Sequence, residues 1–398
     1  MRVVLAFSGG LDTSVILSLL QEKLNAEVIT VTVDVGQNDN FEEIALKSEK
    51  LGAVKHYNID AKEEFVKDYV IPAIKANGLY EGKYPLSSAL SRPLIAKKLV
   101  EVAKLEDADA VAHGCTGKGN DQVRFEVTIK ALNPKLKVIA PVRDWKLTRD
   151  WEIEYAKSKG IPVKVKPYSV DENLWGRSIE CGILENPNVE PPNDIFKWTV
   201  APEKAPEKPE CVTIGFECGV PVSINGEKLG PVETIKKLNR IAGAHGVGRI
   251  DHIEDRTIGL KSREVYECPA AISIIEAHKD LEKIVLTKWE LAFKDLVDTT
   301  WTNLVYSGLW VEPLRSDLEA FINNLEKRVN GLVRLKLYKG NVMVVGRYSS
   351  NSIYDAKLIT YESYSTFSQE LAKGFIELWG LQSLVSSWLS TPVKKKSW

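Results

Sequence analysis

In the first half of the chain, short β-branched runs alternate with segments whose apolar residues recur at helical spacing. The runs typical of buried strands are residues 3–7, 28–33, 54–59, 110–113 and 138–141. The helical pattern is clearest in residues 12–24, where the apolar positions form one stripe. Strand, helix and strand in repeated alternation predict an α/β fold built on a doubly wound parallel sheet.

Polar or glycine-rich segments follow several of these predicted strands. Residues 8–14, 34–37 and 114–121 each begin where a strand is expected to end. In a doubly wound sheet the ligand crevice lies outside the carboxyl ends of the strands. We therefore expect the three segments to converge on one site.

The first of these segments reads Ser-Gly-Gly-Leu-Asp-Thr-Ser over residues 8–14. Glycine lets the backbone approach an anion closely, the first N–H groups of the following helix attract phosphate, and Ser8, Thr13 and Ser14 add hydroxyl groups. The segment lacks the Lys-Ser/Thr ending of a Walker A loop and the G-x-G-x-x-G of a Rossmann fingerprint. Asp12 suits Mg²⁺ or a helix cap, and a plain glycine turn capped by Asp12 is the structural alternative. The context of strand, loop and helix favours a phosphate site.

A second block, residues 113–125, combines three glycines with many polar side chains directly after a predicted strand. It supplies donors for a carboxylate or phosphate and groups that hold an amine or ureido nitrogen. The side chains concerned are Thr116, Lys118, Asn120, Asp121 and Arg124. The block predicts a zwitterionic amino-acid substrate, although Lys118 is equally well explained as a solvated loop charge.

The second half of the chain has a different pattern. A length of 398 residues favours two domains, and a proline-rich stretch at 186–210 predicts an extended connection. The strand-like runs beyond it are 211–216, 220–224, 333–337 and 341–345. With long helices between them, including one at about 270–300, they predict an α+β second domain. A last apolar helix at 366–389 must bury its apolar side chains against another surface, so we expect it to dock on another subunit.

Composition limits the partners. The formal charge is -1, from 53 basic and 54 acidic residues, so no overall field attracts nucleic acid or an anionic membrane. The basic run 394–396 is interpreted as a solvated tail. Neither a signal peptide nor an apolar stretch of about 18 residues is found. We expect a cytoplasmic protein.

Neither cysteines nor histidines indicate a metal site. The five cysteines are scattered without a Cys-x-x-Cys pair, which argues against disulfides and zinc. The histidines show no ligand spacing with one another or with cysteine, so we expect core or surface positions. Those considered are His56, His245, His252 and His278.

Residues 6–14 resemble the pyrophosphate loop of the N-type ATP pyrophosphatases, which cleave ATP between the α- and β-phosphates. Residues 113–125 resemble the signature of the argininosuccinate synthase family, and the likeness continues in order over most of the chain. The further matching segments are 84–86, 91–93, 171–174, 182–187, 246–251 and 261–263. The resemblance implies a HUP nucleotide-binding domain (adenine nucleotide α-hydrolase-like) at 1–168, a synthetase domain at 169–362 and a helical arm at 363–398 that supports a homotetramer.

The resemblance also implies ligands for individual residues, while the catalytic side chains stay unknown. Those implied for ATP are Ala6, Phe7, Ser8, Gly9, Gly10, Leu11, Asp12, Thr13, Ser14, Val33 and Gly114. Those implied for aspartate are Thr116, Asn120 and Asp121. Those implied for citrulline are Tyr84, Asn120, Arg124, Ser169, Ser178, Glu254 and Tyr266. Where the family commonly reads Gly-Thr-Ala or Gly-Thr-Ser, residues 87–89 read Ser-Ser-Ala; Ser88 keeps a hydroxyl and Ala89 lacks one.

The activity that the resemblance implies is ATP-dependent ligation of L-citrulline and L-aspartate in arginine biosynthesis. It passes through a citrullyl-adenylate, releases AMP and pyrophosphate, and uses Mg²⁺ with the ATP. The alternatives are an amidotransferase-type synthetase, which needs a glutaminase domain, a tRNA-thiolating enzyme, which usually has a reactive cysteine pair, and a non-catalytic nucleotide sensor. Structural readings also compete at single residues: Tyr84 as a packed turn aromatic, Ser178 as a helix cap, and Glu254 with Arg256 as an exposed ion pair.

Overall fold

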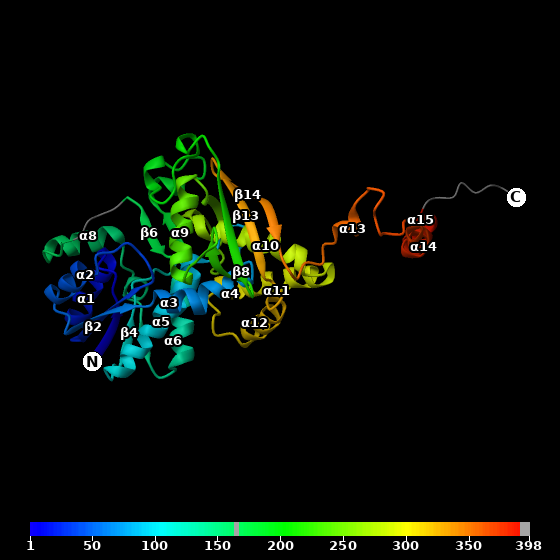
Figure 1. Ribbon diagram of the computed structural model, residues 1–398. Helices are drawn as coiled ribbons and strands as arrows, with labels where there is room; N and C mark the ends of the chain where they lie inside the picture. Colours follow the sequence, from blue (N-terminus) through cyan, green and yellow to red (C-terminus); the bar gives the residue numbers. More distant parts are fainter. Residues whose placement is uncertain (163–166, 391–398) are drawn as a thin grey trace. The chain divides into compact units, whose positions relative to one another are not determined.

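The structure is a computed structural model that describes residues 1–162 and 167–390 (Figure 1). The chain forms two compact units, Met1–Asn351 and Ser352–Trp398. The expected solvated tail at 394–396 lies outside the described residues. The first unit spans the expected boundary between residues 168 and 169, and the limits of the three domains stay predictions.

A five-stranded parallel sheet forms the beginning of the first unit, with the strand order β3-β2-β1-β4-β5 (Figure 1). Its strands are β1 (Arg2–Ala6), β2 (Glu27–Asp34), β3 (Lys55–Asp60), β4 (Ala110–Ala112) and β5 (Lys137–Ile139). Each overlaps the run from which it was predicted, so the parallel α/β fold is confirmed. The order reverses between β1 and β4, and a doubly wound sheet binds its ligand at such a switch point.

Both faces of this sheet are covered. Val3 and Leu5 pack in one apolar cluster with residues of α1 (Leu11–Leu24). Val4 lies in another cluster with residues of α5 (Ser87–Leu105). Successive side chains of a strand point to opposite faces, so β1 is buried from both sides. Each such apolar side chain contributes about 1.5–3 kcal/mol by leaving water. The carboxyl end of β1 is thereby fixed beside α1.

Two antiparallel sheets follow in the rest of the first unit. The larger has the order β10-β9-β8-β13-β14. Its strands are β8 (Glu210–Glu217), β9 (Val220–Ile224), β10 (Glu227–Lys228), β13 (Gly331–Tyr338) and β14 (Asn341–Tyr348). Helices α9 (Pro231–Ala244) and α10 (Pro269–Val285) pack against each other and against this sheet. The expected strands and the α+β character of this region are confirmed.

The smaller sheet has four strands in the order β11-β12-β7-β6. They are β6 (Ser169–Asn173), β7 (Gly176–Glu180), β11 (Arg249–Asp255) and β12 (Lys261–Glu267). Helix α5 of the first half packs against β6 and β7. The smaller sheet therefore joins the parallel sheet to the second half of the chain.

One long helix expected at 270–300 is in fact two helices. Helix α10 ends at Val285, and α11 (Lys288–Tyr306) begins after a break in which Leu286 is extended. Thr287 starts α11 as a capping box: its hydroxyl accepts from the Glu290 N–H, and the Glu290 carboxylate accepts from the Thr287 N–H. This local cap outweighs the continuous apolar pattern, and the expectation of a single helix was wrong.

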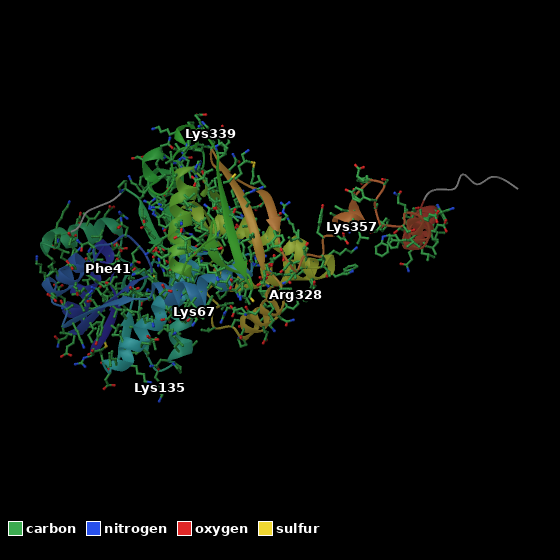
Figure 2. All side chains as sticks on the ribbon, in the orientation of Figure 1. Phe41, Lys67, Lys135, Arg328, Lys339 and Lys357 are labelled. Atoms are coloured by element: carbon green, nitrogen blue, oxygen red, sulfur yellow. The ribbon has the colours of Figure 1, made fainter. Side chains whose placement is uncertain are left out.

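Residues 186–210 contain two short 3-10 helices, η3 (Asn193–Ile195) and η4 (Pro202–Lys204), and no α-helix, as the prolines predicted. Surface charges are partly paired: Arg328 with Glu290, and Lys339 with Glu207. Figure 2 shows such side chains projecting from the ribbon. No described helix has the length and apolar character needed to cross a membrane.

The second unit consists of α13 (Ala356–Ile359), α14 (Glu370–Trp379) and α15 (Leu381–Ser390). The expected terminal helix is thus present as two helices that meet at Gly380. None of the three helices contains a buried residue. Large apolar side chains including Phe375, Trp379 and Trp388 are exposed.

Candidate active site

The loop between β1 and α1 is arranged to hold an anion. Gly9 has a φ of 71°, and Gly10 is the N-cap of α1 without any side-chain cap. Ser14 Oγ donates to the Gly10 carbonyl at 2.6 Å. The first N–H groups of α1 therefore face outward with the positive end of the helix dipole. Asp12 lies in the first turn and is not the cap, so the plain capped-turn alternative is wrong.

Other predicted ATP residues lie at the same edge of the sheet. A Cβ placed on Gly114 would come within 3.6 Å of Asp12 Cβ and of Thr13 Cγ2, so the segment after β4 touches the first turn of α1. Val33 lies near the carboxyl end of β2, and the neighbouring Thr32 hydroxyl donates to the Phe7 carbonyl at 2.5 Å. The segments that follow β1 and β4 therefore meet, and the end of β2 lies beside the start of the loop.

Lys47 is a basic residue at this loop that sequence reasoning missed. It extends from α2 (Phe41–Lys50), and its Nζ donates to the Gly9 carbonyl at 2.6 Å. Partial burial lowers the pKa of this ammonium. The side chain brings a positive charge to the loop expected to hold phosphate. Nothing in the local sequence marks it, because the contact depends on how α2 packs.

Two carboxyl groups also lie beside the loop. Burial raises the pKa of Asp12, and the charge of Arg149 opposes that shift. Burial, together with the charge of Asp12, raises the pKa of Glu152 to about 7. Glu152 belongs to α8 (Arg149–Ser158), and its side chain is buried. Burial thus disfavours the ionised form of both carboxyl groups.

The citrulline residues implied in the second half share one face of the smaller sheet. Ser178 is paired in register with Asp171 and with Tyr266, and Ser169 is paired with Glu180. Paired residues in neighbouring strands point to the same face. Counting by twos along β11 from the partner of Tyr266 places Glu254 on this face as well. The sheet thus presents Ser169, Ser178, Glu254 and Tyr266 together, and Ser178 lies in a strand and caps no helix.

Glu254 is a buried carboxylate held by two phenols. Tyr266 Oη donates to its Oε2 and Tyr306 Oη donates to its Oε1, both at 2.6 Å. Each carboxylate oxygen keeps a lone pair for an amine. Arg256 bonds to other groups, including the Lys118 carbonyl at 3.1 Å. The alternative of an exposed Glu254–Arg256 pair is therefore wrong.

Tyr84 connects the two halves of the chain. It precedes α5, is buried, and its ring stacks on Tyr266 with centroids 4.5 Å apart. Its hydroxyl accepts from the Ser88 N–H at 2.9 Å and lies 2.8 Å from Ser88 Oγ. Burial raises the pKa of Tyr84 to about 12, so the phenol stays protonated. Ser88 therefore bonds to a predicted citrulline residue, while Ala89 is fully buried.

The second block leads into α6 (Asp121–Leu132), and three of the predicted ligands lie at the start of this helix. Asn120 donates to Tyr306 Oη at 2.9 Å and accepts from the Thr257 N–H at 2.9 Å. Arg124 donates to Asp121 and, through Nε and Nη2, to the Tyr306 carbonyl. These contacts use three of the five N–H donors of Arg124 and leave others for a ligand carboxylate.

Thr116 lies apart from this group. It is exposed in the turn before α6, beside Gly119. Asp121, in contrast, lies between two guanidinium groups, those of Arg92 and Arg124. Their charges outweigh burial and hold the pKa of Asp121 below its usual value. Arg92 also bonds to Asp171 at 2.8 Å. The structure therefore brings Asn120 and Asp121 together and leaves Thr116 on the rim.

Four residues near the site had no predicted role: Tyr80, Arg92, Asp171 and Tyr306. Arg92 and Asp171 lie in segments that match the family, so their motifs carried a signal. Tyr80 and Tyr306 had none. Their rings stack with centroids 3.4 Å apart and planes 5° apart, although 226 positions separate them in the sequence.

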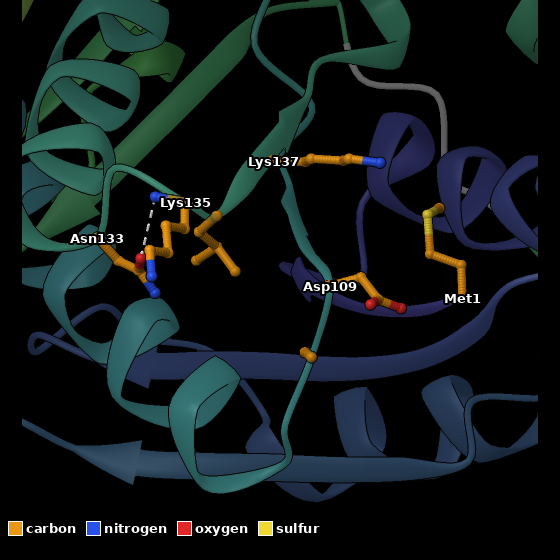
Figure 3. Close-up of a pocket in the computed structure, with 7 residues that line it drawn as sticks. Met1, Asp109, Asn133, Lys135 and Lys137 are labelled. Carbon is orange, nitrogen blue, oxygen red and sulfur yellow. Dashed lines mark hydrogen bonds between the residues drawn. The ribbon is translucent and has the colours of Figure 1, made fainter.

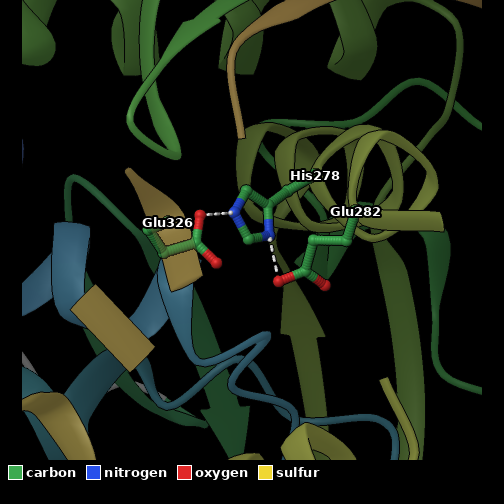
Figure 4. A group of neighbouring side chains, drawn as sticks. All are labelled: His278, Glu282 and Glu326. Atoms are coloured by element: carbon green, nitrogen blue, oxygen red, sulfur yellow. Dashed lines mark hydrogen bonds and ion pairs between the residues drawn. The ribbon is translucent and has the colours of Figure 1, made fainter. Parts of the chain in front are cut away.

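A group of buried charges lies elsewhere in the first unit (Figure 4). His278, Glu282 and Glu326 are the one group of three possible metal ligands among residues 1–162 and 167–390. His278 Nε2 is 2.9 Å from Glu326 Oε2, and Lys294 Nζ is 2.9 Å from Glu282 Oε1. The ammonium already supplies a cation to these carboxylates. His278 is thus a core residue, as expected, within an ion network.

A shallow pocket of about 520 Å³ lies at the other end of the parallel sheet (Figure 3). Met1, Asp109 and Lys137 line it, at the amino ends of β1, β4 and β5. Strands in a parallel sheet all begin at one edge and end at the other, so this pocket lies opposite the phosphate loop. It contains none of the predicted ligands.

Two family models match the chain. The model described as Arginosuccinate synthase N-terminal HUP domain matches residues 2–162, and the Arginosuccinate synthase C-terminal domain matches residues 168–386. Together with the parallel sheet and its glycine loop, they define an ATP-dependent ligase with a HUP nucleotide-binding domain.

The chain is similar in sequence to several argininosuccinate synthases over nearly its full length. An argininosuccinate synthase of Pyrococcus furiosus is 67% identical over 97% of this chain and 94% of its own. Those of Pyrobaculum aerophilum and Bacillus subtilis are 58% and 54% identical, and each match covers 98% of the relative and 97% or 99% of this chain. The chain belongs to the argininosuccinate synthase family. This assignment replaces the amidotransferase-type, tRNA-thiolating and sensor alternatives.

Proposed function

We propose that the chain ligates L-citrulline to L-aspartate with ATP at the edge where the phosphate loop, the start of α6 and the smaller sheet meet. The observation that carries the proposal is the cluster of Asn120, Arg124 and Glu254. A guanidinium with spare donors suits the carboxylate of an amino acid, and a buried carboxylate with spare lone pairs suits its amine. The proposal is supported by Gly114, which belongs to the same block as Asn120 and Arg124 and lies against the first turn of α1.

In the first step the ureido oxygen of citrulline attacks the α-phosphorus of ATP. A new O–P bond forms, the bond from the α-phosphorus to the bridging oxygen breaks, and pyrophosphate leaves with that electron pair. The N–H groups at the start of α1 and the Lys47 ammonium favour the developing charge on pyrophosphate. The product of this step is a citrullyl-adenylate.

In the second step the amine of aspartate attacks the ureido carbon of the adenylate. A C–N bond forms, the C–O bond to AMP breaks, and the amine gives up a proton. Thr116, Asn120 and Asp121 would hold aspartate. No protein nucleophile takes part, so positioning and charge stabilisation supply the acceleration.

The remaining ligand assignments follow the same geometry. Residues Ala6 to Ser14, with Val33 and Gly114, would contact ATP. Tyr84, Ser169, Ser178 and Tyr266 would line the citrulline site with the cluster named above. Mg²⁺ would accompany ATP, and Asp12 fits it because its carboxylate is a hard oxygen ligand in the first turn of α1, beside the loop. When bound, the ion would neutralise phosphate charge.

We also propose a cytoplasmic homotetramer with domains at 1–168 and 169–362 and an arm at 363–398. All five cysteines are free thiols, which suits a reducing compartment. The apolar side chains of the second unit are exposed in one chain, so a second copy is the expected cover.

A product assay with the full-length protein tests the proposed reaction. With ATP, citrulline and aspartate, AMP and pyrophosphate should form in equal amounts, and omitting either citrulline or aspartate should abolish steady turnover. Release of ADP, or turnover that does not depend on citrulline, would contradict the proposal.

A further inference from the structure

Tyr306 is the last residue of α11, and its side chain is almost fully buried below the cluster proposed to bind citrulline. Its hydroxyl donates to Glu254 Oε1 at 2.6 Å and accepts from Asn120 Nδ2 at 2.9 Å. Its carbonyl accepts from Arg124 Nε at 3.2 Å and from Arg124 Nη2 at 3.0 Å. One residue therefore touches three of the proposed citrulline ligands.

These three ligands come from separate parts of the chain. Asn120 and Arg124 flank the start of α6, while Glu254 belongs to β11. The hydroxyl of Tyr306 bonds to the group proposed for the amine of citrulline. Its carbonyl bonds to the group proposed for the carboxylate. Tyr306 thus links the two charged side chains that must match the spacing of one amino acid.

The surroundings of the ring keep Tyr306 in one position. The ring stacks on Tyr80 and meets Tyr84 edge to face at a centroid distance of 6.1 Å. Burial and the charge of Glu254 raise the pKa of Tyr306, so the phenol keeps the proton that it donates.

We propose that Tyr306 is a positioning residue for citrulline, which holds Glu254 through its hydroxyl and Arg124 through its carbonyl. The inference rests on the proposed binding of citrulline at this cluster. It adds a contribution from α11 to a site otherwise built from the smaller sheet, the start of α6 and Tyr84, which precedes α5. The substrate itself does not need to touch Tyr306.

Tyr306→Phe tests the hydroxyl, because it removes one oxygen and keeps both the ring and the carbonyl. Loss of a hydrogen bond to a charged group should raise the KM for citrulline by about 10-fold to 100-fold. The KM for ATP should stay within about twofold, because the loop is untouched. A general structural role would raise the constants of all three substrates together and lower the melting temperature.

Tyr80→Phe is the matched control. It removes a hydroxyl from the other ring of the stack, one that donates to the Asp255 carbonyl at 2.8 Å and not to Glu254. Its kinetic constants should stay near those of the wild type. An unchanged KM for citrulline in Tyr306→Phe, an equal change in both variants, or a Phe variant that does not fold would overturn the assignment.

A double-mutant cycle shows whether Tyr306 acts through Glu254. In a Glu254→Gln background, the further effect of Tyr306→Phe on citrulline binding, measured by calorimetry, should be smaller than in the wild type. An equal effect in both backgrounds would contradict a role through Glu254. Turnover of citrulline by the wild type tests the proposed function. The ratio of the KM for citrulline in the variant to that in the wild type tests the role of Tyr306.

Discussion

Arg92→Met removes the cation that holds two carboxylates at the site. Arg92 Nε lies 2.8 Å from Asp121 Oδ2, and its Nη2 lies 2.8 Å from Asp171 Oδ1. Breaking a fully buried ion pair costs about 3–5 kcal/mol, and an exposed pair contributes at most about 1 kcal/mol. The three side chains are 15%, 29% and 33% exposed. We therefore expect the free energy of unfolding to fall by about 2–3 kcal/mol.

Denaturant unfolding at neutral pH measures this loss, and Arg2→Met is the control. Arg2 pairs with Glu27 at 3.1 Å, but both side chains are largely exposed, so its loss should cost less than about 1 kcal/mol. Arg92→Met should also raise the KM for aspartate, because Asp121 loses one of its two guanidinium partners. Adding Asp171→Asn should restore part of the stability, since one uncompensated carboxylate is removed. The reasoning would be refuted if Arg92→Met were as stable as the wild type. It would also be refuted if the variant with both Arg92→Met and Asp171→Asn had a lower free energy of unfolding than Arg92→Met.

Further predictions concern the loop and the arm. Lys47→Met should raise the KM for ATP about tenfold in steady-state kinetics with little change for citrulline; an unchanged KM would exclude a role for this ammonium. The pKa of Glu152 rises from 4.5 to about 7 on folding, so the protonated form favours the folded state and the stability it contributes is lost as the pH rises through this window. Between these two pH values the free energy of unfolding should fall by up to about 3 kcal/mol, and Glu152→Gln should flatten its dependence on pH. If the wild type and Glu152→Gln showed the same dependence on pH, the prediction would be contradicted. Removal of residues 366–398 should lower the native mass in light scattering, and an unchanged mass would refute the role of the arm.

The parts of the site that sequence could predict are contiguous. The phosphate loop and the block after β4 each carry glycines and polar groups within a few residues, directly after a buried strand. The parallel fold then brings them together without further information, and Gly114 does lie against the first turn of α1. The local sequence pattern and the fold class were sufficient to predict that these two segments meet.

The smaller sheet could not be predicted in the same way. Its strands carry charged and polar residues, such as the run Arg-Ile-Asp-His-Ile-Glu-Asp of β11, and one face carries the side chains proposed to bind citrulline. A strand whose inward side is polar loses the apolar alternation that marks a half-buried strand. Family resemblance implied individual ligands in this sheet, while the pattern of hydrophobicity did not.

Contacts between residues far apart in the sequence also could not be predicted. Lys47 and Tyr306 reach the proposed site through contacts with residues far apart in the sequence, and no motif marks them or Tyr80, whose ring stacks on Tyr306. The break at Leu286 and Thr287 shows the converse case, in which a local capping box ended a helix that the apolar pattern appeared to continue. Tertiary packing determines the long-range contacts, whereas one hydrogen-bonded cap determines where the helix ends.

The most direct test of the proposed chemistry follows one oxygen atom. Citrulline labelled with heavy oxygen in its ureido group is supplied with ATP and aspartate, and the released AMP is examined by mass spectrometry. Attack of the ureido oxygen on the α-phosphate requires the label to appear in the phosphate of AMP. Unlabelled AMP would contradict a citrullyl-adenylate, and ADP as the product would contradict cleavage between the α- and β-phosphates.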